Sequence, residues 1–271
     1  MKTAIVFHGL TGVYGKYGQG ASLDLSRPFN SFKKNILDCN DNIDIFIHSW
    51  TTEKESEVLN LYNPVLYKFE TQKIFDVEYT VFGRKFKEYN LTSGEPDKFM
   101  EQMGIRFHSM YSKWYSAKQS IKLKQEHEKK YNFKYDMTML LRFDLGYNKK
   151  FIFSEFDAGK IYVTACPAVE ADKGLSDLYV LSTSEICDRI FGDDGIFDYI
   201  QTNTDFPNDL FHNHYHLKKI IDTKNLTDKI HKLYPERTAE NTNSIVYVDR
   251  DLDGHYTFQQ KAENPLNKYT K

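Results

Sequence analysis

Hydrophobic and polar positions alternate along the chain in blocks that predict an α/β protein. Apolar runs rich in β-branched residues predict buried strands at residues 3–7, 43–48 and 65–69. The stretches between them predict short helices at residues 31–37 and 52–61. This β-α-β-α-β order predicts parallel strands joined by right-handed crossovers, as in nucleotide-binding half-domains.

The second half of the chain continues the α/β pattern. Apolar residues at helical spacing predict a long helix over residues 98–130, broken near Gly104, and residues 135–145 predict the central strand. The remaining predicted elements are strands at 161–164, 178–181 and 245–248 and helices at 184–191 and 208–221. We therefore expect a single domain with a Rossmann-like, mostly parallel central sheet flanked by helices.

Composition and charge exclude several classes of protein. Of 271 residues, 40% are hydrophobic and 27% are charged, which is typical of a folded globular protein. The 36 basic residues against 38 acidic ones give a net charge of -2, so we expect no nucleic-acid partner. No apolar run is long enough for a transmembrane segment. Three widely spaced cysteines favour reduced thiols and a cytoplasmic location.

A glycine-rich loop, with five glycines between residues 9 and 20, follows the first predicted strand. Such a loop lies at the carboxyl edge of the sheet, where open α/β folds bind ligands and where glycine lets the backbone approach a nucleotide. Its spacing matches neither G-x-G-x-x-G nor the Walker motif. The residues expected near a nucleotide at this edge are His8, Gly9, Leu10, Thr11 and His48. A core-packing role is the alternative for His48.

Five segments carry a family resemblance. The clearest are Asp44-Ile-Phe-Ile-His-Ser-Trp50, Ser109-Met-Tyr-Ser112 and Arg142-Phe-Asp-Leu145, and weaker ones lie at 176–180 and 207–217. Together they resemble GT-A-fold glycosyltransferases of bacterial and viral surface glycans such as capsule and lipopolysaccharide. The resemblance implies a GT-A-like nucleotide-sugar-binding and catalytic domain over residues 1–221. Residues 222–271 are then an extension packed on the same domain.

The resemblance implies transfer of a sugar from a UDP-, GDP- or dTDP-linked donor to a glycan or polysaccharide acceptor. In such enzymes a strand-end Asp-x-Asp motif binds a divalent cation that bridges the donor diphosphate. Here the motif reads Arg142-Phe143-Asp144, so we expect Asp144 to bind Mn²⁺ or Mg²⁺ and Arg142 to contact the diphosphate. An ion pair between these two residues is the structural alternative. His216, with His214 as an alternative, is the expected further metal ligand.

A transferase that inverts the sugar also needs a carboxylate base near the acceptor hydroxyl. The candidates are Asp209, after Pro207 in the first turn of a predicted helix, and Asp177, before a short strand. The alternative for Asp209 is structural, because an Asp in the first turn of a helix is favourable for capping alone.

Two other classes of function stay open. One is a non-catalytic protein of the same fold that binds a nucleotide or glycan, which the missing first acidic residue of the motif favours. The other is a nucleotidyltransferase. The glycine-rich loop argues against the second class because it contains one lysine, Lys16, and no further basic residue.

Overall fold

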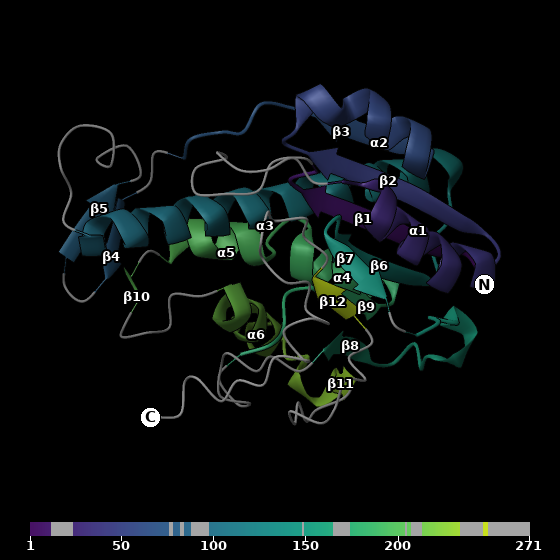
Figure 1. Cartoon of the computed structure of the whole chain (residues 1–271). Coiled ribbons are helices and arrows are strands. Elements are labelled where there is room, and N and C mark those ends of the chain that lie inside the picture. Colours follow the sequence, from purple (N-terminus) through teal and green to yellow (C-terminus); the bar gives the residue numbers. More distant parts are fainter. Residues whose placement is uncertain are drawn as a thin grey trace, which may run out of the picture.

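A seven-stranded sheet with helices packed on both faces forms the centre of the computed structural model (Figure 1). The structure describes residues 1–11, 24–75, 78–81, 84–87, 98–147, 149–164, 174–203, 205–206, 213–233 and 246–248. The strand order is β11-β8-β9-β6-β1-β2-β3. These strands are β1 (Thr3–Gly9), β2 (Ile43–Ser49), β3 (Leu66–Phe69), β6 (Met137–Arg142), β8 (Ile161–Thr164), β9 (Tyr179–Ser182) and β11 (Ile230–Leu233).

The sheet is mostly parallel, because only β9 runs against its two neighbours, β6 and β8. A second sheet has the order β10-β4-β5, and β12 pairs with β7. The bounds of these strands are β4 (Glu78–Val81), β5 (Arg84–Lys87), β7 (Leu145–Tyr147), β10 (Asp205–Phe206) and β12 (Val246–Val248). The predicted α/β class and mostly parallel sheet are confirmed, and residues beyond 221 contribute β11 to the central sheet.

Six α-helices lie between the described strands. They are α1 (Ser26–Asn35), α2 (Glu55–Tyr62), α3 (Lys98–Tyr131), α4 (Ser184–Phe191), α5 (Ile196–Thr202) and α6 (Asn213–Thr223). Single 3₁₀ turns occur at η2 (Leu37–Cys39), η3 (Thr52–Lys54), η5 (Phe153–Glu155) and η6 (Thr227–Lys229). No helix in the described ranges is both long and apolar enough to cross a lipid bilayer.

Several predicted boundaries were wrong for identifiable reasons. The first helix begins at Ser26, where the Asp24 carboxylate accepts hydrogen bonds from the Ser26 backbone N–H and hydroxyl. Helix α3 continues through Gly104 without a break, because one glycine in a long helix costs only about 1 kcal/mol. The central strand ends at Arg142, since the chain turns at residues 143–144 and continues as β7, which pairs with β12.

The two faces of the central sheet are covered by different helices. Successive strand side chains point to opposite faces. In β1, Ala4 and Val6 join a core with α3, α4, α5 and α6, whereas Ile5 and Phe7 join a core with α1 and α2. By the same alternation, the side chain of His8 lies on the α3 face.

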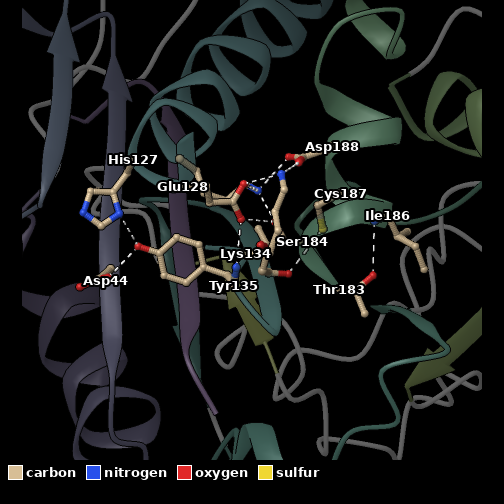
Figure 2. A network of polar contacts seen from close by, with 12 residues as sticks. Asp44, His127, Glu128, Lys134, Tyr135, Thr183, Ser184, Ile186, Cys187 and Asp188 are labelled. Carbon is tan, nitrogen blue, oxygen red and sulfur yellow. Dashed lines mark hydrogen bonds and ion pairs between the residues drawn. The ribbon is translucent and has the colours of Figure 1, made fainter. Parts of the chain in front are cut away.

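Helix α3 is fastened to α4 by buried charges (Figure 2). The Lys124 ammonium, on α3, is fully buried and forms ion pairs with Glu128 Oε2 at 3.1 Å and Asp188 Oδ1 at 2.8 Å. Ser184, the first residue of α4, donates a hydrogen bond to Glu128 Oε1 at 2.5 Å and also contacts Lys124. The exposed Lys134 adds a bond of 2.8 Å to Glu128 Oε2. This network holds α3 against α4, and α3 also supplies Lys113 and Ser116 to the candidate site described next.

Candidate functional site

The candidate site lies at the carboxyl ends of β1 and β6. After β1, β2 and β3 the chain returns to form β6 on the other side of β1, so β1 and β6 flank a topological switch point. Open α/β sheets bind ligands in the crevice outside the strand ends at such a point. His8 of β1 stands in register with Arg142 of β6 and with His48 of β2, which brings three of the predicted residues to one edge.

Arg142 and Asp144 form an ion pair at this edge. Arg142 Nε donates a hydrogen bond of 2.8 Å to Asp144 Oδ1, and a second guanidinium nitrogen contacts Asp144 Oδ2. Both side chains are largely buried. The structural alternative from the sequence is therefore what the structure shows, and it holds the guanidinium in a fixed orientation beside β1.

A second buried ion pair lies next to the first. Lys113, on α3, contacts the Asp177 carboxylate and donates a hydrogen bond of 2.8 Å to the Asp177 backbone carbonyl. Burial lowers the pKa of Lys113 to about 8, against the opposing charge of Asp177. Burial also works against ionisation of Asp177, yet the charges of Lys113, His214 and Arg142 hold its pKa far below the ordinary value. Asp177 is therefore an ionised and poorly basic carboxylate.

His214, near the start of α6, contacts the same carboxylate. Its Nδ1 lies 3.0 Å from the Leu175 backbone carbonyl and 3.3 Å from Asp177 Oδ1. The Leu175 N–H donates a hydrogen bond of 3.0 Å to the His214 carbonyl in return. The segment around Leu175 and the beginning of α6 are thus joined by two hydrogen bonds, with Asp177 between Lys113 and His214.

His8 is the uncharged member of a cluster that also contains the two ion pairs, Arg142–Asp144 and Lys113–Asp177. Burial, together with the charges of Lys113 and Arg142, keeps the pKa of His8 well below its usual range. Its Nδ1 has no hydrogen-bond partner within the described part of the chain. A neutral imidazole does not repel the neighbouring cations, and it keeps one polar atom unsatisfied at the switch point.

His48 and Gly9 fix the shape of the strand ends. His48 is fully buried, with Nε2 3.0 Å from Glu70 Oε1 and Nδ1 2.7 Å from Ser116 Oγ. Burial lowers the pKa of His48 to about 4, so the ring is neutral at pH 7. The Gly9 N–H donates a hydrogen bond of 2.8 Å to the same Ser116 oxygen. Ser116, on α3, therefore fastens the ends of β1 and β2, and the nucleotide contact of His48 stays a prediction.

The loop after β1 begins with a sharp backbone turn. Gly9 has a φ of +103°, which side-chain-bearing residues rarely adopt. Leu10 is exposed, whereas Thr11 is buried and its backbone N–H donates a hydrogen bond of 3.0 Å to Thr51 Oγ1. The rest of the predicted glycine-rich loop, residues 12–20, lies outside the described residues, as does the candidate base Asp209.

The expected metal site has few ligands among the described residues. They contain no group of three or more His, Cys, Asp or Glu side chains placed to hold a metal ion. Arg142 engages both oxygens of Asp144, and Lys113 engages Asp177. His216 is fully buried, like Leu217, Ile220 and Ile221 of the same helix. These donors do not by themselves fit a hard cation, which prefers several free oxygen ligands.

Sequence reasoning missed Lys113 as a member of the site. The sequence did not indicate that Lys113 belongs to the site, because basic residues on amphipathic helices usually face solvent. The signal that could have revealed it is a lysine set among the apolar residues Met110, Tyr111 and Trp114, all of which the structure buries.

Comparisons with known proteins add no family assignment. A scan against protein-family models found no match, and a search of the curated proteins found no significantly similar sequence.

Proposed function

We propose that this protein is a GT-A-like glycosyltransferase that moves a sugar from a nucleotide-sugar donor to a glycan or polysaccharide acceptor. The observation that carries the proposal is the pair of oriented cations, Arg142 and Lys113, at the carboxyl-edge switch point of a mostly parallel sheet. The short sequence segments that resemble GT-A enzymes support the same reading. Of these segments, Asp44–Trp50 covers most of β2 and the residue after it, and Arg142–Leu145 begins at the last residue of β6.

The chemistry of the donor explains why such cations are useful. Sugar transfer breaks the bond between the anomeric carbon and a diphosphate, and negative charge develops on the leaving diphosphate. A guanidinium held by Asp144 is already oriented for bidentate contact with phosphate oxygens. Lys113 is a second positive charge whose interaction is strengthened because its surroundings exclude water.

Charge balance makes the proposal more specific. Lys113 and Arg142 are matched by Asp177 and Asp144, so the described cluster is close to neutral when His8 is uncharged. A diphosphate therefore needs either release of Arg142 from Asp144 or additional positive charge. Mn²⁺ or Mg²⁺ stays a prediction for that additional charge, and the experiment below measures the effect of Mn²⁺ on donor binding directly.

We propose a UDP-, GDP- or dTDP-linked donor and a reaction in the cytoplasm. The free thiols of Cys39 and Cys187 suit a reducing compartment.

A thermal-shift panel tests the proposal. UDP-, GDP-, dTDP- and CMP-sugars are added with and without Mn²⁺, and a ligand at 100 times its Kd stabilises the native state by about 2.7 kcal/mol. We expect one donor class to raise the melting temperature, and Arg142→Lys to weaken that shift by removing the bidentate contact. Arg189→Lys is the matched control, because Arg189 lies on α4 and bonds the Lys224 carbonyl. If no donor shifts the wild type, with or without Mn²⁺, the proposal is wrong.

A non-catalytic binding protein is the second candidate. The observation that favours it is the Arg142–Asp144 pair, which occupies the carboxylate that the family resemblance assigns to the metal. This candidate predicts a donor-induced shift without release of nucleoside diphosphate in the presence of acceptors.

A further inference from the structure

We propose that His8 binds the donor diphosphate, with its Nδ1–H donating a hydrogen bond to a phosphate oxygen beside the cations Lys113 and Arg142. This inference rests on the proposed function and deepens it, because it names the atom of β1 that binds and the part of the donor that is bound. The sequence placed His8 near a nucleotide without giving it a partner or a role.

His8 is a buried polar side chain with an unsatisfied nitrogen. The residue is 3% exposed, and its Nδ1 has no hydrogen-bond partner within the described part of the chain. A buried polar atom without a partner costs free energy, so almost all such atoms in folded proteins are hydrogen-bonded. An exception at the ligand-binding edge of an α/β sheet indicates a nitrogen that is reserved for a ligand.

His48 shows what a structural histidine looks like at the same level of the sheet. The two residues stand in register on β1 and β2, and both side chains lie on the α3 face. His48 is fully buried, and its two ring nitrogens contact Ser116 and Glu70. His8 is buried in the same way but has no such partner at Nδ1. Core packing therefore explains His48 and does not explain His8.

The backbone at the end of β1 offers a phosphate few other donors. The Gly9 N–H donates a hydrogen bond to Ser116 Oγ at 2.8 Å, and the Gly9 carbonyl accepts one from the Trp50 N–H at 3.2 Å. The Thr11 N–H is also bonded within the protein. A Cβ at Gly9 would meet no atom within 4 Å, so open space borders this strand end. A ligand that enters this space meets the ring of His8 rather than free N–H groups of Gly9 and Thr11.

The charges around His8 favour an anion. Burial, together with the charges of Lys113 and Arg142, keeps the pKa of His8 well below its usual range, so both cations lie near the neutral ring. An anion attracted to these cations comes close to His8, and a phosphate oxygen accepts hydrogen bonds. Nδ1 therefore carries the proton when the diphosphate is bound. His8 fixes the phosphate at β1, while α3 and β6 supply the positive charge.

The first measurement is a thermal scan of the protein without nucleotide. His8→Leu replaces the unsatisfied nitrogen by carbon at similar volume, so we expect the melting temperature to rise by about 2–6 °C. His48→Leu is the matched contrast, because it leaves Ser116 and Glu70 without their partner and should lower the melting temperature. A melting temperature of His8→Leu at or below that of the wild type would show that the ring supports the fold, and the proposal would be wrong.

The second measurement is calorimetric titration with UDP, GDP, dTDP and inorganic pyrophosphate, at one neutral pH and with Mn²⁺ in every sample. His8→Leu is expected to weaken binding of pyrophosphate and of the tightest nucleotide by about 10–100-fold, because a hydrogen bond to a charged group is lost. His8→Asn keeps an N–H at the position of Nδ1 and should recover part of the affinity. His231→Leu, at an exposed position on β11, should bind as the wild type does. Wild-type affinity in His8→Leu would overturn the proposal.

The probes separate this inference from the proposed function. If sugar is transferred but His8→Leu keeps the wild-type Kd, the glycosyltransferase proposal stands and the role of His8 is wrong. If pyrophosphate and nucleotides bind through His8 while no sugar donor reacts, the diphosphate site stands and the transferase proposal fails. Loss of affinity for nucleotides alone, with pyrophosphate binding unchanged, would place His8 at the nucleoside and refute the phosphate contact. If none of the four probes binds the wild type, both proposals fail.

Discussion

Removing the buried Lys124 ammonium from the α3–α4 network should destabilise the fold strongly. The side chain of Lys124 is 0% exposed and that of Glu128 is 1% exposed, so Lys124→Met leaves Glu128 and Asp188 without their buried partner. Loss of one partner of a buried ion pair costs about 3–5 kcal/mol. Because Glu128 keeps its bonds to Lys134, Ser184 and the Tyr135 N–H, we expect the unfolding free energy to fall by about 3 kcal/mol, at the lower end of this range.

Urea unfolding followed by tryptophan fluorescence measures this loss, and a thermal scan should show a decrease of about 6–12 °C in melting temperature. The matched control is Lys122→Met, a half-turn away on α3. Lys122 is 38% exposed and pairs with Asp193, which is 70% exposed, so its loss should be below about 0.5 kcal/mol. If Lys124→Met is as mild as Lys122→Met, the buried network does not fasten α3 to α4, and the reasoning is refuted.

Three further predictions concern the strand ends. Gly9→Ala should lower the unfolding free energy measured in urea by about 1–3 kcal/mol. The loss comes from the positive φ alone, because a Cβ at this position meets open space. An unchanged urea midpoint would show that the turn is not held as described. Ser116→Ala should lower the unfolding free energy by about 2–4 kcal/mol, because the Gly9 N–H and His48 Nδ1 both lose their bond to the Ser116 hydroxyl. A change within experimental error would contradict this shared hydrogen-bond partner. The folded-state pKa of His48, about 4, lies below its unfolded value near 6.5, and that of His8 is also depressed. As the pH falls, the unfolded chain therefore binds protons at a higher pH than the folded protein does. For His48 alone, the unfolding free energy should decrease by about 2 kcal/mol between pH 7 and pH 5. Equal unfolding free energies at the two pH values would refute buried neutral histidines.

Local patterns in the sequence predicted the elements whose residues interact with near neighbours. The helix over residues 184–191 and the strand over 161–164 were placed correctly, because a capping Thr183 and a short apolar run are local signals. The apolar run over residues 3–7 likewise identified buried residues of β1. The pairing of Arg142 with Asp144 was foreseeable as the structural alternative because the two residues are close neighbours in the sequence, although Asp144 lies in the turn after β6.

Contacts between distant parts of the chain could not be predicted in this way. Lys113 and Asp177 are 64 residues apart, and His214 meets Leu175 across 39 residues. The reversed direction of β9 and the return of β11 to the sheet edge likewise depend on tertiary pairing rather than on local periodicity. The sequence therefore predicted a site at the carboxyl edge of the sheet with the motif Arg142-Phe-Asp144. The contacts of Asp177 with Lys113 and His214 could be identified only in the folded structure.

The most direct test of the central claim is mass spectrometry of a panel of glycan acceptors incubated with UDP-, GDP-, dTDP- and CMP-sugars in the presence and absence of Mn²⁺. The account predicts that one donor yields a glycan heavier by one sugar residue, with an equal amount of nucleotide product released. It also predicts that Arg142→Lys lowers this yield, whereas the control Arg189→Lys does not. A donor that binds in the thermal-shift panel but gives neither a heavier glycan nor released nucleotide would contradict the glycosyltransferase proposal and favour the binding protein.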